Sequence, residues 1–558
     1  MEAMPREAAA FEPDAAHDPA LGLETRTKFE ILFAVMLGLF LTALDQTIVG
    51  PVLPHIVTDL KGADLYTWVV TAYLLTSTVT IPVYGKLSDL YGRKPLLMIG
   101  IGIFLIGSAL SGLSQEMWQL ILFRAIQGLG AGALFPISLA VVGDLFTPAE
   151  RGKYQGLFGA VFGIAFLVGP FLGGVLTDNA SWHWIFFVNL PIGIVALAVI
   201  ARLLPTIRRE GARNNIDILG IATLTLAIVP VLIALTIAEN GDWSAIGVVG
   251  GFIAGAVFLV LFVLAEVRAE DPVVPLELFR NRTFTVSSVA TFLASFGFAV
   301  AIIFLPLWFQ VVQGASTTAS GYDLLPFLVG LILSSIVTGQ VISRTGHYKW
   351  LVVVAMFLVS VGLALFTNLR ADTATPVMWL WMFIAGVGVG PSFAAFTLIV
   401  QNAVPFTRLG TATADLTLLR QIGTSVGLTV GFTIFSNNLT WDLLRSQIIA
   451  AGAPSAFVPT AAPAGFNISQ QLTQVGGDPL GSFLSQVPPA AQAAFLNGFH
   501  GAFSIALANS MWVGVAAAIV AGISTLFLKE LPLRATHNPA SEFHRAAARS
   551  GSTAPAAD

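Results

Sequence analysis

Apolar stretches of about 20 residues recur along this chain from Phe29 almost to its C-terminus, and each is long enough to cross the hydrocarbon core of a membrane. Of the 558 residues, 56% are hydrophobic and only 10% are charged, whereas an ordinary soluble domain carries about 25% charged residues. A soluble protein of this size would divide into several domains with polar surfaces and linkers. The sequence therefore predicts an all-α, polytopic membrane protein.

The first apolar stretch follows a polar tail and has no small-residue cleavage site behind it, so we interpret it as a spanning helix and not as a signal peptide. Counting onward predicts fourteen spans. They lie at roughly residues 30–53, 66–84, 95–113, 118–142, 154–177, 184–204, 217–236, 245–265, 284–309, 323–343, 350–367, 377–400, 411–436 and 503–528.

The basic residues predict the orientation, because Lys and Arg near span ends stay on the cytoplasmic side. With both termini inside, the cytoplasmic segments hold 22 of the 27 basic residues, and the outer segments hold only Lys61, Arg370 and Arg445. The other two, Arg124 and Arg420, fall inside predicted spans. We therefore expect a multi-pass protein of the inner (cytoplasmic) membrane with both termini in the cytoplasm.

Two pairs of segments indicate an internal duplication. Residues 128–152 align without gaps with residues 386–410 at a shift of 258. In the segments 85–94 and 339–349, Gly85 aligns with Gly339 and Gly92 with Gly346 at a shift of 254. Concordant shifts of this kind are expected when a transporter half has been duplicated. The register leaves six spans in each half and places the seventh and eighth spans between them.

This register predicts five parts. They are a disordered cytoplasmic tail (1–28), an N-terminal six-helix bundle (29–204), two linker helices with cytoplasmic loops (205–283), a C-terminal six-helix bundle that includes an extracellular loop at 437–502 (284–528), and a second disordered cytoplasmic tail (529–558).

Several motifs resemble those of the major facilitator superfamily. GKLSDLYGRK at 85–94 resembles its signature loop, and LDQTIVGPVLP at 44–54, RAIQGLGAGA at 124–133 and GIAFLVGPFLGG at 163–174 resemble its drug/proton antiporter motifs. The segments WHWIFFVNLPIG at 182–193 and RLGTATADLTLLRQIGTSVG at 408–427 are similar to those of the fourteen-helix EmrB/QacA-type branch. The resemblance implies the major facilitator fold and multidrug efflux by proton antiport.

The loop between the second and third spans carries a candidate gate. Gly85 allows close backbone approach, Gly92 permits a tight turn, and Arg93 with Lys94 holds the loop in the cytoplasm. Asp89 can cap a neighbouring helix or pair with Arg93.

The resemblance implies that this cluster latches the two bundles together in the outward-facing state, with Asp144 at the inner end of the fourth span completing a charge relay. The alternative is that the charges only set topology. The second copy carries Ser343 and Arg344 at the corresponding place, so the sequence predicts a latch on one side only.

Asp45 is the candidate for proton coupling, because an ionised carboxylate inside an apolar span is costly unless a cation compensates it. Arg124 can supply that cation. At about 1.5 Å per residue, both lie roughly 10 Å below the outer surface. The alternative is a fixed ion pair that only joins two helices.

In the fifth span, Gly163, Gly169, Gly173 and Gly174 offer a small face for helix packing, and Pro170 bends the helix. The resemblance associates this Gly-Pro motif with antiport. Generic packing is the alternative for the glycines.

The candidates for the substrate cavity are polar or aromatic residues near the predicted spans: Tyr73, Gln127, Trp308, Gln310, Asp323, Asp415, Arg420 and Gln421. For Tyr73 ordinary packing is the alternative. For Asp323 the alternative is a helix cap, because a span is predicted to begin there.

No metal-ligand spacing, phosphate-binding loop or catalytic triad is discernible, so we expect no enzyme, no cofactor and a proton gradient as the energy source. The expected partners are protons, a small-molecule substrate and the lipid bilayer, with no nucleic acid, for a chain that acts as a monomer. The leading hypothesis is export of amphipathic, cationic drugs. The alternatives are an exporter or flippase of lipids or of a dedicated metabolite, and a sensor or uptake symporter.

Overall fold

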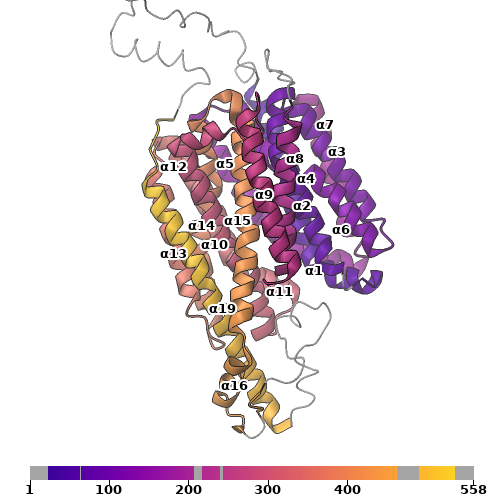
Figure 1. Ribbon diagram of the computed structural model, residues 1–558, viewed down its shortest axis with the longest axis vertical. Helices are drawn as coiled ribbons and strands as arrows, with labels where there is room; N and C mark the ends of the chain where they lie inside the picture. The colour runs from indigo at the N-terminus through magenta and orange to yellow at the C-terminus, as the bar shows by residue number, and fades with distance from the viewer. Residues whose placement is uncertain are drawn as a thin grey trace, which may run out of the picture.

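The computed structural model describes residues 23–62, 65–205, 216–238, 243–455, 458–461 and 489–533. Within these ranges every regular element is a helix (Figure 1), and fourteen helical segments are long and apolar enough to cross a membrane. The all-α fold with fourteen spans is thus confirmed. Residues 1–22 and 534–558 of the two predicted tails lie outside the described residues, and α1 begins before the predicted bundle boundary.

The N-terminal bundle forms from helices that satisfy their own backbone hydrogen bonds, as an apolar span must in lipid. The turn between the second and third helices is made by Gly92, whose φ of 93° suits glycine. The bundle consists of α1 (Thr25–Leu60), α2 (Tyr66–Tyr91), α3 (Arg93–Ser111), α4 (Met117–Leu145), α5 (Pro148–Asn179), and a last span divided into α6 (Trp184–Phe187) and α7 (Asn189–Leu203).

The linker pair and the C-terminal bundle follow. The pair consists of α8 (Ile218–Ala238) and α9 (Ile246–Arg268). The bundle consists of η2 (Leu276–Arg280), α10 (Arg282–Val312), α11 (Thr317–Asp323), α12 (Leu325–Thr345), α13 (Lys349–Phe366), α14 (Thr375–Ala403), η3 (Phe406–Arg408), α15 (Leu409–Asn438), α16 (Trp441–Ala450) and α19 (Pro489–Leu526).

The last helix is longer than predicted. The sequence places the final span at 503–528, whereas α19 begins at Pro489, inside the predicted outer loop. Its first turns carry Phe495 and Phe499, which are buried, and it packs against α16 beyond one end of the bundle (Figure 1). The helix continues because this apolar face has a partner helix to cover it. Residues 456–457 and 462–488 of the loop lie outside the described residues.

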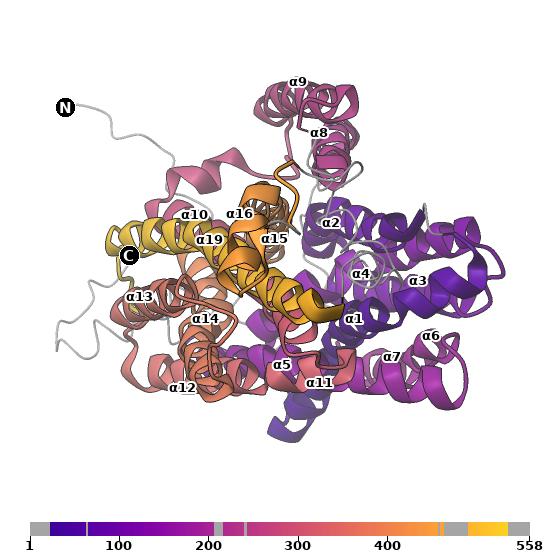
Figure 2. The ribbon, with the colours of Figure 1, turned by 90° about the horizontal axis from the view of Figure 1, so that it is seen from below.

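The two bundles meet along two seams, α2 against α15 and α5 against α12 (Figure 2). At the first seam a Cβ on Gly85 would overlap Ala414 and press on the Gly410 carbonyl. At the second a Cβ on Gly339 would overlap the Gly152 carbonyl. Gly339 and Gly410 are the duplicated copies of Gly85 and Gly152, so the two seams repeat one contact.

The linker pair covers the first of these seams from outside (Figure 2). Leu224 and Ile228 of α8 share one apolar cluster with Ile81 of α2 and Leu418 of α15. One face of α9 is left exposed at Val260, as expected of a helix that borders lipid.

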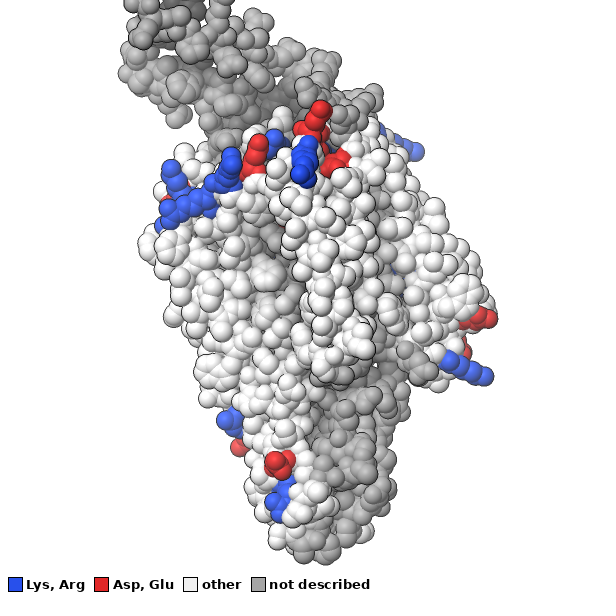
Figure 3. Space-filling model, viewed as in Figure 1, with Lys and Arg blue, Asp and Glu red and all other residues white. Residues whose placement is uncertain are grey.

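On the face drawn in Figure 3, charged side chains gather at the upper end, with smaller groups at the right-hand edge and toward the lower end, and a broad uncharged area lies between them. We call the upper end in Figure 3 the basic end. It carries the α2–α3 turn, η3 and the residues that follow α19. In or near these segments lie Lys86, Arg93, Arg408 and Lys529.

Candidate functional site

Asp45 and Arg124 form a fully buried ion pair inside the N-terminal bundle. Asp45 lies on α1 and Arg124 on α4, with 2.5 Å between the arginine Nη1 and the carboxylate Oδ2. Asp45 is 0% exposed and Arg124 is 1% exposed. The sequence suggested this pair from the matching depth of the two residues, and each now compensates a charge that would otherwise be buried alone.

Three neutral side chains complete this network. Gln127 accepts from Arg124 Nη1 and donates from Nε2 to Asp45 Oδ1, at 2.8 Å in each case. Asn189 of α7 donates from Nδ2 to Asp45 Oδ1 at 3.3 Å and to Ser108 Oγ of α3 at 3.1 Å. The network therefore joins α1, α3, α4 and α7, and Gln127, predicted to line the substrate cavity, is fully buried within it.

The prediction from sequence did not include Asn189. The segment 182–193 contributes to the family resemblance, but an asparagine within an apolar span is itself a signal for a buried polar contact. Tyr73, predicted as a cavity residue, is 1% exposed. Its ring centroid lies 4.2 Å from the Arg124 Cζ, so it stabilises the guanidinium by a cation–π contact, which agrees with its alternative packing role.

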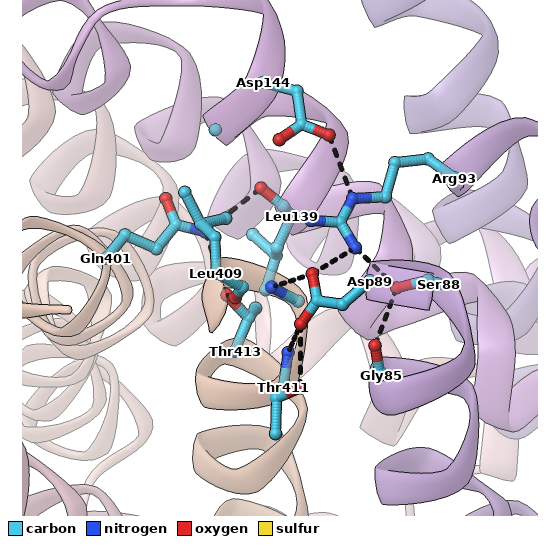
Figure 4. Close-up of polar contacts among 12 residues, drawn as sticks. Gly85, Ser88, Asp89, Arg93, Leu139, Asp144, Gln401, Leu409, Thr411 and Thr413 are labelled. Atoms are coloured by element: carbon cyan, nitrogen blue, oxygen red, sulfur yellow. Dashed lines mark hydrogen bonds and ion pairs between the residues drawn. The ribbon is translucent and has the colours of Figure 1, made fainter. Parts of the chain in front are cut away.

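A second charged network lies at the basic end (Figure 4). Arg93 is paired with Asp89 at 2.6 Å and with Asp144 at 2.9 Å. It also donates to Ser88 Oγ at 2.8 Å. All four residues are buried, and the structure thus brings together the three charged residues of the predicted relay.

Asp89 also reaches across the seam to the N-terminus of α15 (Figure 4). Its carboxylate accepts hydrogen bonds from the Gly410 N–H at 3.1 Å, the Thr411 N–H at 2.7 Å and the Thr411 hydroxyl at 2.7 Å. The N-cap residue of α15, Arg408, forms no side-chain cap. A carboxylate of the N-terminal bundle therefore supplies the anionic cap that this helix N-terminus favours.

At the other seam the N-terminus of α5 is capped from within its own bundle. Helix α5 carries its own capping box, in which Thr147 and Glu150 satisfy the free N–H groups. Ser343, which stands in the duplicated position of Asp89, donates instead to the Ala149 carbonyl. The two seams differ because α5 caps its own N-terminus, whereas α15 has no side-chain cap of its own.

Glutamines add neutral contacts between the bundles at this end. Gln401 of α14 donates to the Leu139 carbonyl of α4 at 3.1 Å (Figure 4) and accepts from Gln155 of α5 at 2.8 Å. Sequence reasoning did not include them. With these bonds and the Asp89 cap in place, the bundles are held together at the basic end.

In the described part of the chain the Lys94 side chain makes no hydrogen bond or ion pair.

The glycines of the Gly-Pro motif on α5 lie against two different helices. A Cβ on Gly169 would overlap Thr47 of α1, whereas one on Gly163 would overlap Ile332 of α12. The small face thus allows close packing both within the N-terminal bundle and across the seam. The rest of the motif lies in the same helix: Pro170, Gly173 and Gly174.

Two of the predicted cavity residues make contacts inside the C-terminal bundle. Trp308, predicted to line the cavity, is 0% exposed, and its Nε1 donates to Ser504 Oγ of α19 at 2.9 Å. Its indole fills the bundle interior because Ser504 satisfies its N–H there. Gln310 is half-buried and donates to Ser320 Oγ at 2.8 Å.

Asp323 is the last residue of α11 and accepts a hydrogen bond from Trp379 Nε1 at 3.3 Å. It does not cap the next helix, which begins at Leu325 without a side-chain cap. The helix-cap alternative is therefore wrong. Partial burial raises the pKa of Asp323, and the Trp379 hydrogen bond opposes that shift.

Asp415 and Arg420, both on α15, differ from the charges described above. Asp415 is 1% exposed, and neither of its carboxylate oxygens has a hydrogen-bond partner among the described residues. Arg420 is half-buried, with its Cζ 4.7 Å from the Phe393 ring and 5.6 Å from the Phe135 ring. Gln421, the next residue in the sequence, is also half-buried.

The charged groups differ in how they relate to the two bundles. One buried ion pair lies within a single bundle, one charged cap crosses a seam, and two charges have no hydrogen-bonding or ionic partner in the described ranges. Groups of these kinds can change protonation or pairing when helices move.

Comparison with known proteins agrees with this arrangement. The model of the Major Facilitator Superfamily matches residues 35–226 and 218–428. The chain is 34% identical over 520 residues to multidrug resistance protein 3 of Bacillus subtilis (strain 168), covering 93% of this chain and 98% of that protein. It is 34% identical over 514 residues to the multidrug transporter protein MdtP of the same strain, covering 90% and 93%.

Among solved structures, the proton:xylose symporter XylE bound to 6-bromo-6-deoxy-D-glucose superposes with a TM-score of 0.58 at 13% identity, covering 93% of this chain and all of that one. At this identity the likeness concerns the fold alone.

Proposed function

Because the chain belongs to the major facilitator superfamily, we propose that it is a multidrug efflux transporter that exports amphipathic compounds across the cytoplasmic membrane in exchange for protons. Both termini then lie in the cytoplasm, and the basic end is the cytoplasmic end. Alternating access follows from rocking of the two bundles about the seams.

The observation that carries proton coupling is the buried Asp45–Arg124 pair. Burying an ion pair inside an apolar bundle costs free energy of desolvation. Its two partners come from different helices of the N-terminal bundle, α1 and α4. When Asp45 takes up a proton, its ionic attraction to Arg124 is lost, and the arginine keeps its hydrogen bond to Gln127 and its contact with the Tyr73 ring. Proton binding and helix position are then linked, which is the requirement for coupled transport.

The Asp89 network supplies the gate in this proposal. Its bonds to Gly410 and Thr411 exist only while the basic end is closed. Opening toward the cytoplasm must break them and leave the first N–H groups of α15 without their anion. The network therefore favours the outward-facing arrangement until substrate or proton binding offsets that preference.

The substrate is proposed to be amphipathic. The expectation of a cationic drug requires a carboxylate that the drug can reach between the bundles. Of the two candidates, Asp415 is 1% exposed and Asp323 lies outside the spans, at the end of α11.

Purified full-length protein in proteoliposomes tests this function. We expect an imposed proton gradient to drive ethidium or another amphipathic dye against its concentration gradient, and a protonophore to abolish that transport. A fluorescent phospholipid in the same panel tests the lipid alternative. Dye movement that is unaffected by the protonophore would contradict proton coupling, and transport of the phospholipid alone would contradict drug efflux.

A further inference from the structure

Arg420 is a cation held between the two bundles by aromatic rings. Its guanidinium lies over Phe393 of α14 in the C-terminal bundle and faces Phe135 of α4 in the N-terminal bundle, with 4.7 and 5.6 Å from its Cζ to the two ring centroids. Residues of both halves thus meet at this one guanidinium.

No anion compensates this charge in the described part of the chain. The Nη2 atom of Arg420 is buried without a hydrogen-bond partner, and no ion pair involves the residue. Asp415, five residues earlier on α15, lies about 140° away around the helix. By contrast, Arg124 is bonded to Asp45 and Gln127. Cation–π contacts of about 0.5–2 kcal/mol do not replace the hydrogen bonds that a buried guanidinium loses.

The surroundings of Arg420 are aromatic and partly accessible. Phe162 of α5 lies 5.5 Å from Phe135 and 5.6 Å from Phe393, between ring centroids, and Phe298 of α10 lies 6.5 Å from Phe393. All four rings and Arg420 itself are half-buried although they lie on helices that face the opposite bundle. A ligand therefore finds apolar surface on several sides of a single cation.

We propose that Arg420, Phe135, Phe162 and Phe393 form a binding site for an amphipathic anion. A carboxylate or sulfonate accepts hydrogen bonds from the free guanidinium N–H groups, and an apolar body packs on the rings. Charge-assisted bonds of this kind are strong and directional, whereas a cationic group placed here is repelled. This inference rests on the proposed transport function and adds amphipathic anions to the compounds that the protein would carry.

Three probes that share one apolar body test the site: pyrenebutyrate, its uncharged methyl ester, and pyrenebutyltrimethylammonium. Their affinities for purified full-length protein are measured by equilibrium dialysis. We expect pyrenebutyrate to bind roughly 10-fold more tightly than the ester, because bonds to a charged group are worth at least that factor, and the ammonium probe to bind more weakly than the ester.

Matched variants assign the preference to Arg420. Arg420→Gln is expected to reduce the affinity for pyrenebutyrate to that for the ester and to leave the ester unchanged, whereas Arg420→Lys keeps part of the preference. Arg408→Gln, which removes an exposed arginine paired with Glu277 before the same helix, is the control and should leave all three affinities unchanged. Phe393→Ala should lower the affinities for the acid and for the ester by the same factor, because both probes pack the same apolar body on the ring.

Equal affinities of the wild-type protein for the acid and the ester would overturn the proposal. An equal fall of both affinities in Arg420→Gln would also overturn it, because such a result indicates a structural role for Arg420. Ethidium transport is measured on the same preparations. If proton-driven transport of ethidium persists while the acid shows no preference, the anion site is wrong and the transport function stands. If the acid binds as expected but no probe is transported, the transport function is wrong.

Discussion

The two six-helix bundles differ in whether their buried charges are paired with opposite charges. In the N-terminal bundle Asp45 is bonded to Arg124, and Arg93 to Asp89 and Asp144. In the C-terminal bundle Asp415 and Arg420 have no hydrogen-bonding or ionic partner in the described ranges. The sequence predicts that the two halves arose by duplication, yet only the N-terminal half pairs these buried charges within the protein.

This difference separates two uses of a charge in a membrane protein. A paired charge stabilises one arrangement of helices and is costly to separate. An unpaired charge such as that of Arg420 contributes nothing to folding that would explain its cost, so we infer that Arg420 serves to bind a ligand. The contrast predicts that equivalent substitutions in the two halves have very different effects.

The largest effect is expected for the arginines. Arg124→Met leaves Asp45 buried without its cation and is expected to lower the free energy of unfolding by roughly 3–5 kcal/mol. Arg420→Met removes a charge that has no protein partner and is expected to change stability by less than about 1 kcal/mol. Thermal unfolding in detergent compares them.

The double variant Asp45→Asn with Arg124→Met serves as the control, because it removes both charges and should recover part of the lost stability. A loss in Arg420→Met as large as that in Arg124→Met would show that Arg420 has a structural partner, and the contrast between the bundles would be broken.

The next effect concerns the two seams. Asp89→Asn weakens the cap on α15 by an expected 1–3 kcal/mol, the range for a hydrogen bond to a charged group, and shifts the protein toward opening at the basic end. The chain has no cysteine, so single cysteines introduced at the opposite end report accessibility to a thiol reagent. Their labelling should decrease.

Ser343→Ala is the matched variant at the duplicated position, and it should change labelling little because α5 keeps its own capping box. Equal shifts in Asp89→Asn and Ser343→Ala would remove the asymmetry between the seams.

The smallest effect is expected at Glu530, which follows α19 and accepts hydrogen bonds from N–H groups at the start of α13. Burial alone disfavours its carboxylate, but the N–H groups of Tyr348 and Lys349 and the nearby His347 outweigh burial and lower the pKa of Glu530. The group therefore contributes stability above its ordinary pKa, and this contribution is lost as the pH falls through the lowered value.

Since Glu530 is partly exposed, the contribution should be below about 1 kcal/mol. Unfolding temperatures of wild type and Glu530→Gln should differ at neutral pH and converge as the pH falls below the lowered pKa of Glu530. A difference that persists unchanged in acid would exclude the charged cap.

The sequence predicts the fold well because hydropathy, basic residues and duplication each constrain spans independently. It also suggests the Asp45–Arg124 pair, since depth in the membrane can be counted from span ends. It does not predict the neighbours of Arg420, because they depend on how helices of two bundles are rotated toward one another. The early start of α19 depends on its packing against α16, which no local pattern reveals.

The central claim is that proton coupling resides in the paired network of the N-terminal bundle and not at unpaired Asp415. Gradient-driven dye transport in proteoliposomes containing Asp45→Asn or Asp415→Asn tests it most directly. We predict that Asp45→Asn loses transport against the dye gradient but keeps downhill movement, and that Asp415→Asn still transports dye uphill. Uphill transport that survives in Asp45→Asn and is lost in Asp415→Asn would contradict the account.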